Sequence, residues 1–595
     1  MGRGHTHQSP DTTRSKLFFL CILVGFIAVL ARLFYWQVVE ASALQEAAEN
    51  QYQKSFSTTG TRGLIVTSDN YPLVANQDVY RLFAQPKLLA NSPEEIASQL
   101  TPLLMEEIQT ASSAAEYKEQ SEKLQKQLVE KLSQSDKSWV SLFQPVHTKT
   151  KKMIEDLSIF ALGFDTYQQR WYPEASIAAT ITGFVGKNDE GEDTGYFGIE
   201  GALNKELSGR KKISTILTDA LGKQLLGSNQ TASGVLHGRS VTTTLRRDVQ
   251  YLLYKNLENA MEKYGARSGE IILMEPATGK ILGLVTLPAY DPMDFSKYPT
   301  ELYKNPSLVS AYEPGSTFKV LTVAAGIDAK KITADTTCPV CGGPRVFGKY
   351  TIRTWNDVYN PNITMRDALA KSDNTAMIHI AELVGADTFE SYLRTFKIGE
   401  PIGIDLQEDT KTPFPSKFGP VELATISFGQ GISTTSMQLL RAINAIANNG
   451  VMMRPYIIEK VEDENGQETA IEPIQEGQVI SPEAAREVVD MMITSAHSGE
   501  AQWVARDAYT VAGKTGTSQI PSPTGGYEED KTIASFIGFA PAHDPAFIML
   551  VKLVEPTSSP WAAETAAPLW YTIADDLLLM LQVPSSSYES RDVSI

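Results

Sequence analysis

A serine and a lysine three positions apart form the first arrangement in the chain that can do chemistry. Ser316 and Lys319 lie in the segment Glu-Pro-Gly-Ser-Thr-Phe-Lys, and a largely apolar run, residues 320–327, follows. Because proline and glycine favour a turn and the run predicts a buried helix, we expect Ser316 at a helix N-terminus, where free N–H groups favour a developing negative charge. Lys319 is expected one turn on, on the same face. A hydroxyl with an amine in reach is a candidate nucleophile with its base, provided that burial or a nearby positive charge lowers the pKa of the amine.

A second group of polar residues, Ser372, Asp373 and Asn374, follows a predicted helix from 365 to 370. Ser372 is suited to pass a proton between Lys319 and a leaving group, and the Asn374 amide is suited to hold a substrate carbonyl. The same three residues also fit an ordinary capped turn.

The third group lies on a predicted strand, Val-Ala-Gly-Lys-Thr-Gly-Thr-Ser, residues 511–518. Gly516 has no side chain, so an extended peptide can lie along this strand and bond to its main chain. Lys514 and the hydroxyls of Thr515 and Thr517 are then placed to bind a substrate carboxylate. Taken alone, this segment also fits an ordinary edge strand.

None of these motifs is specific by itself, and an isolated S-x-x-K is usually a helix cap followed by an exposed lysine. In the order S-x-x-K, S-D-N, K-T-G, however, they are the signature of penicillin-recognising serine enzymes. The sequence therefore predicts acyl transfer through Ser316, assisted by Lys319, Ser372 and Lys514. We expect no metal and no organic cofactor.

The elements that must position these residues occupy positions 239–580 of the sequence. Residues 270–275 and 280–287 are predicted to form a hairpin whose turn uses Gly279, and further strands are predicted at 509–514, 533–539 and 547–554. With helical patterns between and around them, they predict an α+β domain built on a five-stranded antiparallel sheet with helices on both sides.

At 595 residues the chain is too long for one core. Before the predicted catalytic domain, residues 40–238 are expected to form an elongated, β-rich domain without catalytic residues, with a helical insertion at about 92–152. Residues 581–595 are expected to be a disordered tail.

The N-terminus predicts one transmembrane helix. Basic residues precede an apolar segment, residues 17–39, that ends with the aromatic cluster Phe34, Tyr35 and Trp36. Its length suits one span, and the positive-inside rule leaves residues 1–16 in the cytoplasm and the catalytic part outside the cell membrane. A cleaved signal peptide is the alternative, because the run before Arg32 is short and contains small residues.

Charge and cysteine content narrow the partners. The net charge of −17 argues against non-specific binding to nucleic-acid phosphates, so we expect no nucleic-acid partner.

Cys338 and Cys341 form a Cys-Pro-Val-Cys pair without a nearby histidine, which does not make a structural zinc site by itself. In an oxidising compartment we expect a disulfide that staples a loop; a redox role is the alternative.

Further segments resemble the class B penicillin-binding proteins, monofunctional transpeptidases of peptidoglycan, and the likeness extends over most of the chain. In the catalytic part they are Ser427-Phe428-Gly429-Gln430-Gly431 with Thr435 and Gln438, and Ala447-Asn448-Asn449-Gly450; before it they are Arg62-Gly63-Leu64-Ile65, Arg170-Trp171-Tyr172-Pro173, Gly183-Phe184-Val185-Gly186, and Gly198-Ile199-Glu200-Gly201 with Leu207-Ser208-Gly209. Residues 66–70 and Arg246 depart from the family's pattern, and both lie in the pedestal or at the domain junction, outside the three catalytic motifs.

The resemblance implies a two-step acyl transfer between peptidoglycan stem peptides. Ser316 would attack the penultimate D-Ala carbonyl, D-Ala would leave, and an amine of a neighbouring stem would resolve the ester, with the oxyanion held by N–H groups of Ser316 and Thr517. β-Lactams would acylate the same serine. The resemblance also implies a dimerisation-type pedestal at 40–238 and a multi-span membrane glycosyltransferase as partner. It implies a role in cell-wall synthesis during either cell division or cell elongation.

Other functions share parts of this pattern. A β-lactamase needs a base for deacylation, and Glu408 lies at a suggestive distance after Ser372, but Thr412 stands where class A enzymes have asparagine. A D,D-carboxypeptidase differs only in using water as the acceptor, and the pedestal favours transpeptidation. A bifunctional enzyme would need acidic glycosyltransferase motifs before the pedestal, and none is evident. A scaffold or a β-lactam sensor would bind without turnover.

Overall fold

The protein is described by a computed structural model over residues 12–45, 53–108, 113–217, 236–506, 508–522 and 525–585. The chain divides into two compact units, Met1–Gly60 with Gly209–His237 and Thr61–Ser208 with Gly238–Ile595. Most of the predicted cytoplasmic stub and of the predicted tail, residues 1–11 and 586–595, lie outside the described residues.

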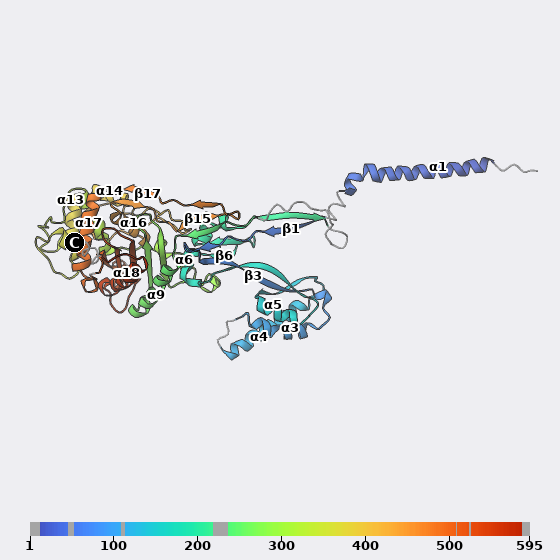
Figure 1. The fold of residues 1–595 in the computed structure, drawn as a ribbon, viewed down its shortest axis with the longest axis horizontal. Coiled ribbons are helices and arrows are strands. Elements are labelled where there is room, and N and C mark those ends of the chain that lie inside the picture. Colours follow the sequence, from blue (N-terminus) through green and yellow to red (C-terminus); the bar gives the residue numbers. More distant parts are fainter. Residues whose placement is uncertain are drawn as a thin grey trace, which may run out of the picture. The chain divides into compact units, whose positions relative to one another are not determined.

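The first unit contains an apolar helix and one strand pair (Figure 1). Helix α1 (Thr12–Phe34) continues as the π-helical turn η1 (Tyr35–Val39), and together they make 28 residues that include a window of mean hydropathy 2.7. By length and composition this helix can cross a membrane, a test that an N-terminal signal sequence also passes. Strands β1 (Gln53–Thr59) and β8 (Lys211–Leu217) pair antiparallel.

The second unit contains a seven-stranded pedestal sheet. Its order is β16-β15-β9-β2-β3-β4, and β5 also pairs with β3. The strands are Ile65–Val66 (β2), Pro72–Ala84 (β3), Val140–Val146 (β4), Leu162–Trp171 (β5), Ser240–Thr243 (β9), Ile458–Glu462 (β15) and Glu468–Ala470 (β16). Strands β9, β15 and β16 follow residue 238, so the predicted catalytic domain supplies part of the pedestal sheet.

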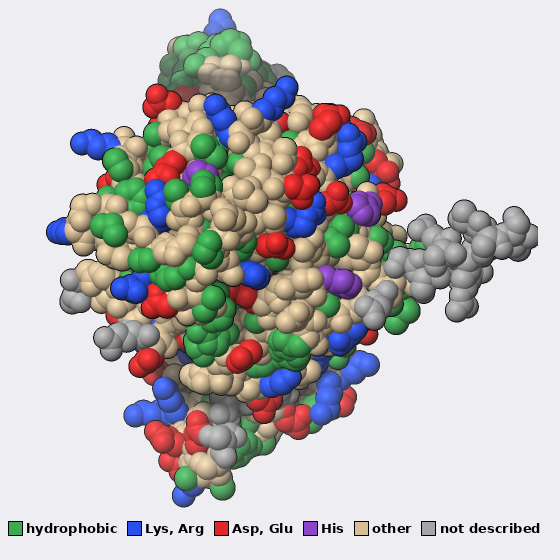
Figure 2. Space-filling view, turned by 90° about the vertical axis from the view of Figure 1, so that its left-hand side faces the viewer, with side chains coloured by type: hydrophobic (Ala, Val, Ile, Leu, Met, Phe, Trp, Pro, Cys, Tyr) green, Lys and Arg blue, Asp and Glu red, His purple; other side chains and the backbone are tan. Residues whose placement is uncertain are grey.

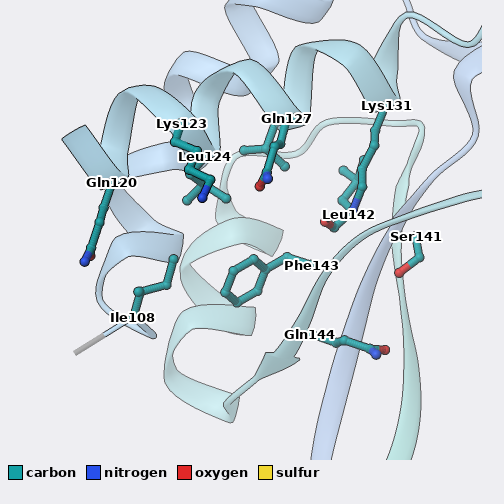
Figure 3. A pocket seen from close by; sticks show the side chains of 11 residues that line it. Ile108, Gln120, Lys123, Leu124, Gln127, Lys131, Ser141, Leu142, Phe143 and Gln144 are labelled. Atoms are coloured by element: carbon teal, nitrogen blue, oxygen red, sulfur yellow. Dashed lines mark hydrogen bonds between the residues drawn. The ribbon is translucent and has the colours of Figure 1, made fainter. Parts of the chain in front are cut away.

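The predicted helical insertion lies at one end of β3 (Figure 1). It consists of α3 (Pro93–Met105), α4 (Ala114–Leu132) and α5 (Thr148–Asp156), and it also contains strand β4, which the helical pattern did not predict. Ser92 and Ser113 cap α3 and α4 by accepting a backbone hydrogen bond, as N-cap serines do. A cavity of about 390 Å³ lies between α4 and β4 (Figure 3).

A buried carboxylate joins the landmark segments of the pedestal. Glu200, in α7 (Gly198–Ala202), is fully buried and pairs with Arg62 and with Arg170. Arg62 also donates to Asn204 Oδ1 at 2.9 Å and to Ser208 Oγ at 2.8 Å. Because a buried carboxylate is stable only when it is paired and hydrogen-bonded, this network explains why arginine and glutamate stand at these positions.

The core of the second unit is the five-stranded antiparallel sheet that the sequence predicts. Its order is β11-β10-β20-β19-β18, and its strands are Ser268–Met274 (β10), Ile281–Leu287 (β11), Ala512–Pro521 (β18), Tyr527–Ala540 (β19) and Phe547–Val554 (β20). The predicted hairpin is β10–β11, and Gly279 in its turn has a φ of +84°. Ile271 and Leu273 belong to one apolar cluster and Ile272 and Met274 to the other, as the alternation along a strand requires.

Helices cover both faces of this sheet, which confirms the α+β prediction. Helices α9 (Arg247–Tyr264) and α18 (Ala566–Met580) bury residues in one cluster; α11 (Lys319–Asp328), α13 (Asn374–Val384), α16 (Ser436–Ala447) and α17 (Pro482–Ser498) contribute to the other. The shorter elements are α6 (Ala179–Thr182), β6 (Phe184–Lys187), β7 (Asp193–Tyr196), α8 (Asn204–Leu207), α10 (Pro306–Val309), β12 (Arg345–Phe347), β13 (Tyr350–Ile352), α12 (Met365–Ala370), α14 (Ala386–Thr395), α15 (Pro420–Ile426), β14 (Val451–Met453) and β17 (Gln475–Gln478). Acidic and basic side chains are interspersed on the face seen in Figure 2.

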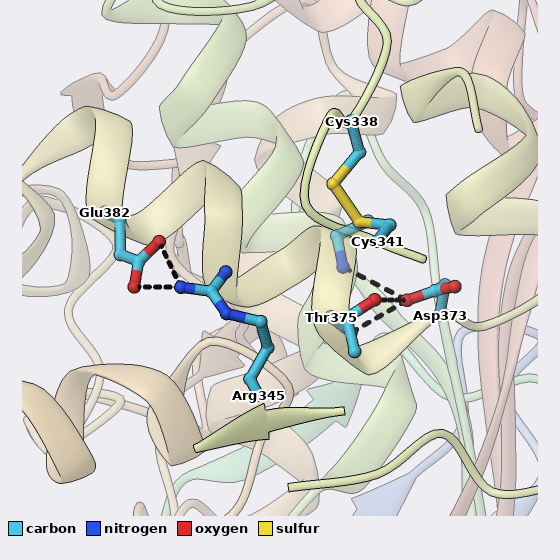
Figure 4. The surroundings of a disulfide bond; sticks show 7 residues. Cys338, Cys341, Arg345, Asp373, Thr375 and Glu382 are labelled. Atoms are coloured by element: carbon cyan, nitrogen blue, oxygen red, sulfur yellow. Dashed lines mark hydrogen bonds and ion pairs between the residues drawn. A yellow bond between two sulfur atoms is a disulfide. The ribbon is translucent and has the colours of Figure 1, made fainter. Parts of the chain in front are cut away.

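The two paired cysteines form the expected disulfide. Cys338 and Cys341 are buried, and the main chain of Cys338 exchanges hydrogen bonds with Ile363 at 2.9 Å and Asn362 at 3.2 Å, just before α12. Figure 4 shows the bond together with the Asp373 cap of α13. The disulfide therefore staples the loop that precedes the predicted S-D-N motif.

Candidate active site

The predicted nucleophile lies in a tight turn. Ser316 belongs to one turn of 3₁₀-helix, η6 (Gly315–Phe318), which runs directly into the buried helix α11. Gly315 donates its N–H to the carbonyl of Gly429 at 3.1 Å. Gly429 has a φ of +83°, and a Cβ atom there would lie 2.8 Å from the Gly315 nitrogen and from Phe318 Cβ. The landmark segment 427–431 is therefore the clamp that holds the nucleophile turn.

Lys319 meets the condition for a base. Its side chain is fully buried, and Nζ donates to the carbonyl of Ser372 at 2.5 Å and to Ser372 Oγ at 3.2 Å. Burial, and then the positive charge of Lys514, lower the pKa of Lys319 to about 7. Among the described residues, no hydrogen bond joins Lys319 to Ser316. Catalytic hydrogen bonds often tighten only when substrate is bound, so this geometry is compatible with proton transfer.

Ser372 lies where the two lysines meet. It is almost fully buried in the turn between α12 and α13, with a φ of +58°, a left-handed conformation that non-glycine residues adopt only under constraint. Its Oγ accepts from Lys319 and from Lys514, each at 3.2 Å. Since a hydroxyl has two acceptor sites and one proton, Ser372 keeps that proton for a third atom.

The rest of the S-D-N motif builds the start of α13. Asp373 caps the helix by accepting from the N–H groups of Thr375 and Ala376 at 2.7 and 3.1 Å (Figure 4). Asn374 Nδ2 donates to the carbonyl of Arg353 at 2.8 Å. One of the two amide N–H groups of Asn374 therefore holds the chain's own carbonyl, and the other remains for a substrate.

The K-T-G motif lies on β18, the edge strand of the sheet. An edge strand can pair with an added extended peptide. A Cβ at Gly516 would lie 2.7 Å from Thr317 Cγ2 and 3.1 Å from the carbonyl of Pro314. The missing side chain therefore makes room for the nucleophile turn, whereas the sequence motif predicted that it makes room for substrate.

The polar side chains of this strand are already engaged. Lys514 is buried, and its Nζ donates to Ser372 Oγ at 3.2 Å, to Thr515 Oγ1 at 3.2 Å and to the Thr515 carbonyl at 3.3 Å. Burial lowers the pKa of Lys514. Thr517 Oγ1 accepts from the N–H of Ala562 at 3.1 Å. The structure thus joins Lys319, Ser372, Lys514 and Thr515 by hydrogen bonds beside the turn that carries Ser316. The catalytic and binding roles that the motifs predict for these residues stay predictions.

Two features of the site have no counterpart among the predicted motifs. Glu500 accepts a hydrogen bond from the Thr515 hydroxyl at 2.5 Å, although no motif surrounds it in the sequence. Trp355 and Trp561 are exposed, with ring centroids 5.3 Å apart. Trp355 lies two residues after Arg353, whose carbonyl accepts from Asn374. Trp561 directly precedes Ala562, whose N–H donates to Thr517 Oγ1. The two rings therefore connect the S-D-N side of the site with the K-T-G side.

Glu408, weighed as a deacylation base, lies elsewhere. Its two carboxylate oxygens accept from the N–H of Gly198, in the pedestal, at 3.1 Å each. Burial raises the pKa of Glu408 to about 7. The carboxyl group therefore belongs to a contact with the pedestal and gives no support to a β-lactamase reaction.

Comparisons with known proteins match both the catalytic part and the pedestal of this chain. Residues 269–575 match the penicillin-binding protein transpeptidase domain, and residues 57–243 match the penicillin-binding protein dimerisation domain. Stage V sporulation protein D of Bacillus subtilis (strain 168) is 29% identical over 583 residues, 97% of this chain and 87% of the relative. The probable peptidoglycan D,D-transpeptidase PenA of Neisseria meningitidis is 27% identical over 557 residues, 93% of this chain and 90% of the relative.

Among solved structures, the fold resembles that of a penicillin-binding protein. Penicillin-binding protein 2X from Streptococcus thermophilus superposes with a TM-score of 0.73 at 23% identity, covering 90% of this chain and 82% of that one. The transpeptidase match alone spans more than half of the sequence. With the dimerisation domain before it and the serine, two lysines and edge strand in place, the chain belongs to the class B penicillin-binding proteins.

Proposed function

We propose that this protein is a peptidoglycan D,D-transpeptidase that cross-links stem peptides through an acyl-enzyme on Ser316. The observation that carries the proposal is the convergence on Ser372 Oγ of two buried lysines, Lys319 and Lys514, beside the nucleophile turn. This arrangement supplies a nucleophile, a base of lowered pKa and a proton relay in one place.

In the acylation step, neutral Lys319 takes the proton of the Ser316 hydroxyl as Oγ attacks the penultimate D-Ala carbonyl. A C–O bond forms, the oxyanion is held by the N–H groups of Ser316 and Thr517, and the tetrahedral intermediate collapses. The C–N bond to the terminal D-Ala breaks, and its nitrogen receives a proton from Lys319 through Ser372. Lys514, Thr515 and Thr517 bind the terminal carboxylate, while Asn374 and the main chain at Gly516 hold the stem peptide.

In the second step, an amine of a neighbouring stem peptide attacks the ester. The new amide bond forms as the C–O bond breaks, the amine proton passes to Lys319, and Ser316 regains its hydroxyl proton. A D,D-carboxypeptidase would use water here. The pedestal supports transpeptidation, because the chain matches the dimerisation domain over residues 57–243 and PenA carries the D,D-transpeptidase name.

The apolar helix Thr12–Val39 supports a single-pass membrane anchor. We infer that the basic N-terminus is cytoplasmic and that the catalytic domain faces the cell wall, as the positive-inside rule indicates. A partner must then supply the glycan strands, and a multi-span membrane glycosyltransferase would meet that need. β-Lactams act as covalent inhibitors by acylating Ser316.

The test is covalent labelling of the detergent-extracted full chain with a fluorescent penicillin. Ser316→Ala is expected to abolish the labelled band, and Lys319→Ala to slow its appearance by about a hundredfold or more, because the base is lost. Ser310→Ala, a hydroxyl on the approach to the turn, is the matched control and should label like the unchanged protein. Labelling that persists in Ser316→Ala, or folded protein that never labels, would overturn the assignment.

A further inference from the structure

Glu500 is fixed beside the K-T-G strand by the helix before it. It follows α17 and Gly499, where a Cβ atom would lie 2.8 Å from the carbonyl of Ala370, at the end of α12. That close approach aims the Glu500 side chain at β18. Its Oε2 accepts from Thr515 Oγ1 at 2.5 Å and lies 4.0 Å from Lys514 Nζ. The side chain is 24% exposed, so it lies within the site wall and not in bulk solvent.

The side-chain hydrogen-bond donors of Lys514 and Thr515 are all in use. Thr515 has one hydroxyl proton, which it donates to Glu500. Lys514 has three ammonium protons and three acceptors within the chain: Ser372 Oγ, the Thr515 carbonyl and Thr515 Oγ1. In this state neither residue offers a free donor to the terminal carboxylate of a substrate.

We propose that Glu500 is a specificity-determining residue. Its carboxylate accepts the hydroxyl proton of Thr515, which is the hydrogen-bond donor that the carboxylate of a ligand needs. This inference rests on the proposed function and adds the control of ligand charge to it. A ligand carboxylate binds only when it displaces Glu500 from Thr515, and it meets a negative charge as it arrives. Anionic ligands therefore bind more weakly than Lys514 alone would allow, and ligands without the carboxylate do not bear this penalty.

Glu500 also acts on the base. The charged groups that face Lys319 are Lys514 on β18, Asp373 at the start of α13 and Glu500 after α17. Burial and Lys514 lower the pKa of Lys319, and the negative charges of Glu500 and Asp373 raise it. Without the Glu500 charge the pKa of Lys319 falls further, so more of the amine is neutral at a given pH.

The experiment compares Glu500→Gln, which removes the charge, with Glu500→Ala, which also frees the Thr515 proton. The acylation rate constant of the detergent-extracted full chain is measured with benzylpenicillin and with its neutral methyl ester. For benzylpenicillin we expect the acylation rate constant to increase about five- to tenfold in Glu500→Gln and at least as much in Glu500→Ala. The rate constant for the methyl ester should change less than about twofold. The midpoint of the pH–rate profile should also fall by roughly half a unit in both variants.

Two further variants separate a local charge effect from a structural one. Glu500→Asp keeps the negative charge and should keep the midpoint of the unchanged protein. Glu483→Gln removes an exposed carboxylate at the far end of α17 and should change neither quantity. Equal changes for penicillin and ester, or an unmoved midpoint, would overturn the role of Glu500 while Ser316 still labels. If Ser316 is never acylated in the unchanged protein, it is the proposed function that fails.

Discussion

At the scale of single residues, the site is organised by two amines that share one hydroxyl. Lys319 and Lys514 both donate to Ser372 Oγ, at 3.2 Å each. Two ammonium groups that meet at one buried atom repel each other, so one of them loses its proton more easily. Burial and the charge of Lys514 lower the pKa of Lys319 to about 7, so Lys319 is the amine that is substantially neutral near neutral pH.

The first prediction is a pH dependence of acylation. The rate of fluorescent-penicillin labelling should rise with pH, with a midpoint near the Lys319 pKa of about 7, and level off above it, because only the neutral amine can take the Ser316 proton. Lys514→Gln removes the neighbouring positive charge that lowers this pKa, so its midpoint should move to higher pH. A flat profile in the unchanged protein, or a midpoint that moves down in Lys514→Gln, would contradict the assignment of Lys319 as the base.

The motifs predicted that Lys319 and Ser372 act together, but not every bond that the site residues make. S-x-x-K predicted Lys319 one turn after Ser316, whereas K-T-G predicted Lys514 only as a ligand of the substrate carboxylate, so the bond from Lys514 to Ser372 Oγ was not foreseen. Glu500 depends on how tightly α17 packs against α12 at Gly499, and the Asn374 bond depends on where the carbonyl of Arg353 lies. Contacts of that kind arise from tertiary packing and leave no local pattern in the sequence.

At the scale of elements, the nucleophile turn is held between a loop and a strand. The loop is the segment 427–431, whose Gly429 carbonyl accepts from the Gly315 N–H at 3.1 Å. The strand is β18, where Gly516 leaves space for Thr317 and Pro314. Two glycines thus allow the loop and the strand to approach the nucleophile turn closely, which keeps the turn in place when the Ser316 hydroxyl attacks or is released.

The second prediction compares two glycines of the same loop. Gly429→Ala places a methyl group against Gly315 and Phe318 at a φ of +83°, so Ser316 labelling should fall by about tenfold or more while the melting temperature falls by only a few degrees. Gly431→Ala carries the same strain at a φ of +71°, but its nearest atom is the flexible Thr425 hydroxyl at 3.1 Å. Labelling and thermal unfolding of both variants check the prediction. Equal loss of labelling in the two would show that backbone strain, and not the contact of position 429 with Gly315 and Phe318, is what matters.

Elements with a strong periodic pattern were predicted well. The β10–β11 hairpin lies where two strand segments around the Gly279 turn predicted it, and the helix predicted at 365–370 is α12. Strand β4 was missed because it lies inside a polar, helix-rich stretch and is a strand only through its pairing with β3. The strands β9 and β15 likewise gain their place in the pedestal sheet from each other and from β2.

At the scale of the whole molecule, the catalytic domain and the pedestal share structure within the second unit. The pedestal sheet uses β9, β15 and β16 from the C-terminal part of the chain. Glu408 and Gln407, after α14, accept from the N–H groups of Gly198 and Phe197 in the pedestal. A boundary at residue 238 therefore separates the chain by sequence, whereas the folded parts hold each other through strands and hydrogen bonds. That sharing makes their stability a joint property.

The last prediction concerns the pH dependence of that joint stability. Burial raises the pKa of Glu408 from its ordinary 4.5 to about 7. Between these values the unfolded chain ionises this carboxyl and the native protein does not, so the free energy of unfolding should fall as pH rises from about 4.5 to 7 and stay level above. Because Glu408 is only partly buried, its contribution to the free energy of unfolding is about 1–3 kcal/mol.

Glu408→Gln lacks this titration. As the pH is raised from 4.5 to 8, the melting temperature of Glu408→Gln should therefore rise by a few degrees relative to that of the unchanged protein, measured by thermal unfolding of the detergent-extracted full chain. Glu119→Gln, an exposed carboxylate on α4, should follow the unchanged protein at both pH values. A Glu408→Gln curve parallel to that of the unchanged protein would mean that the carboxylate is ionised against Gly198, and that the junction tolerates a buried charge.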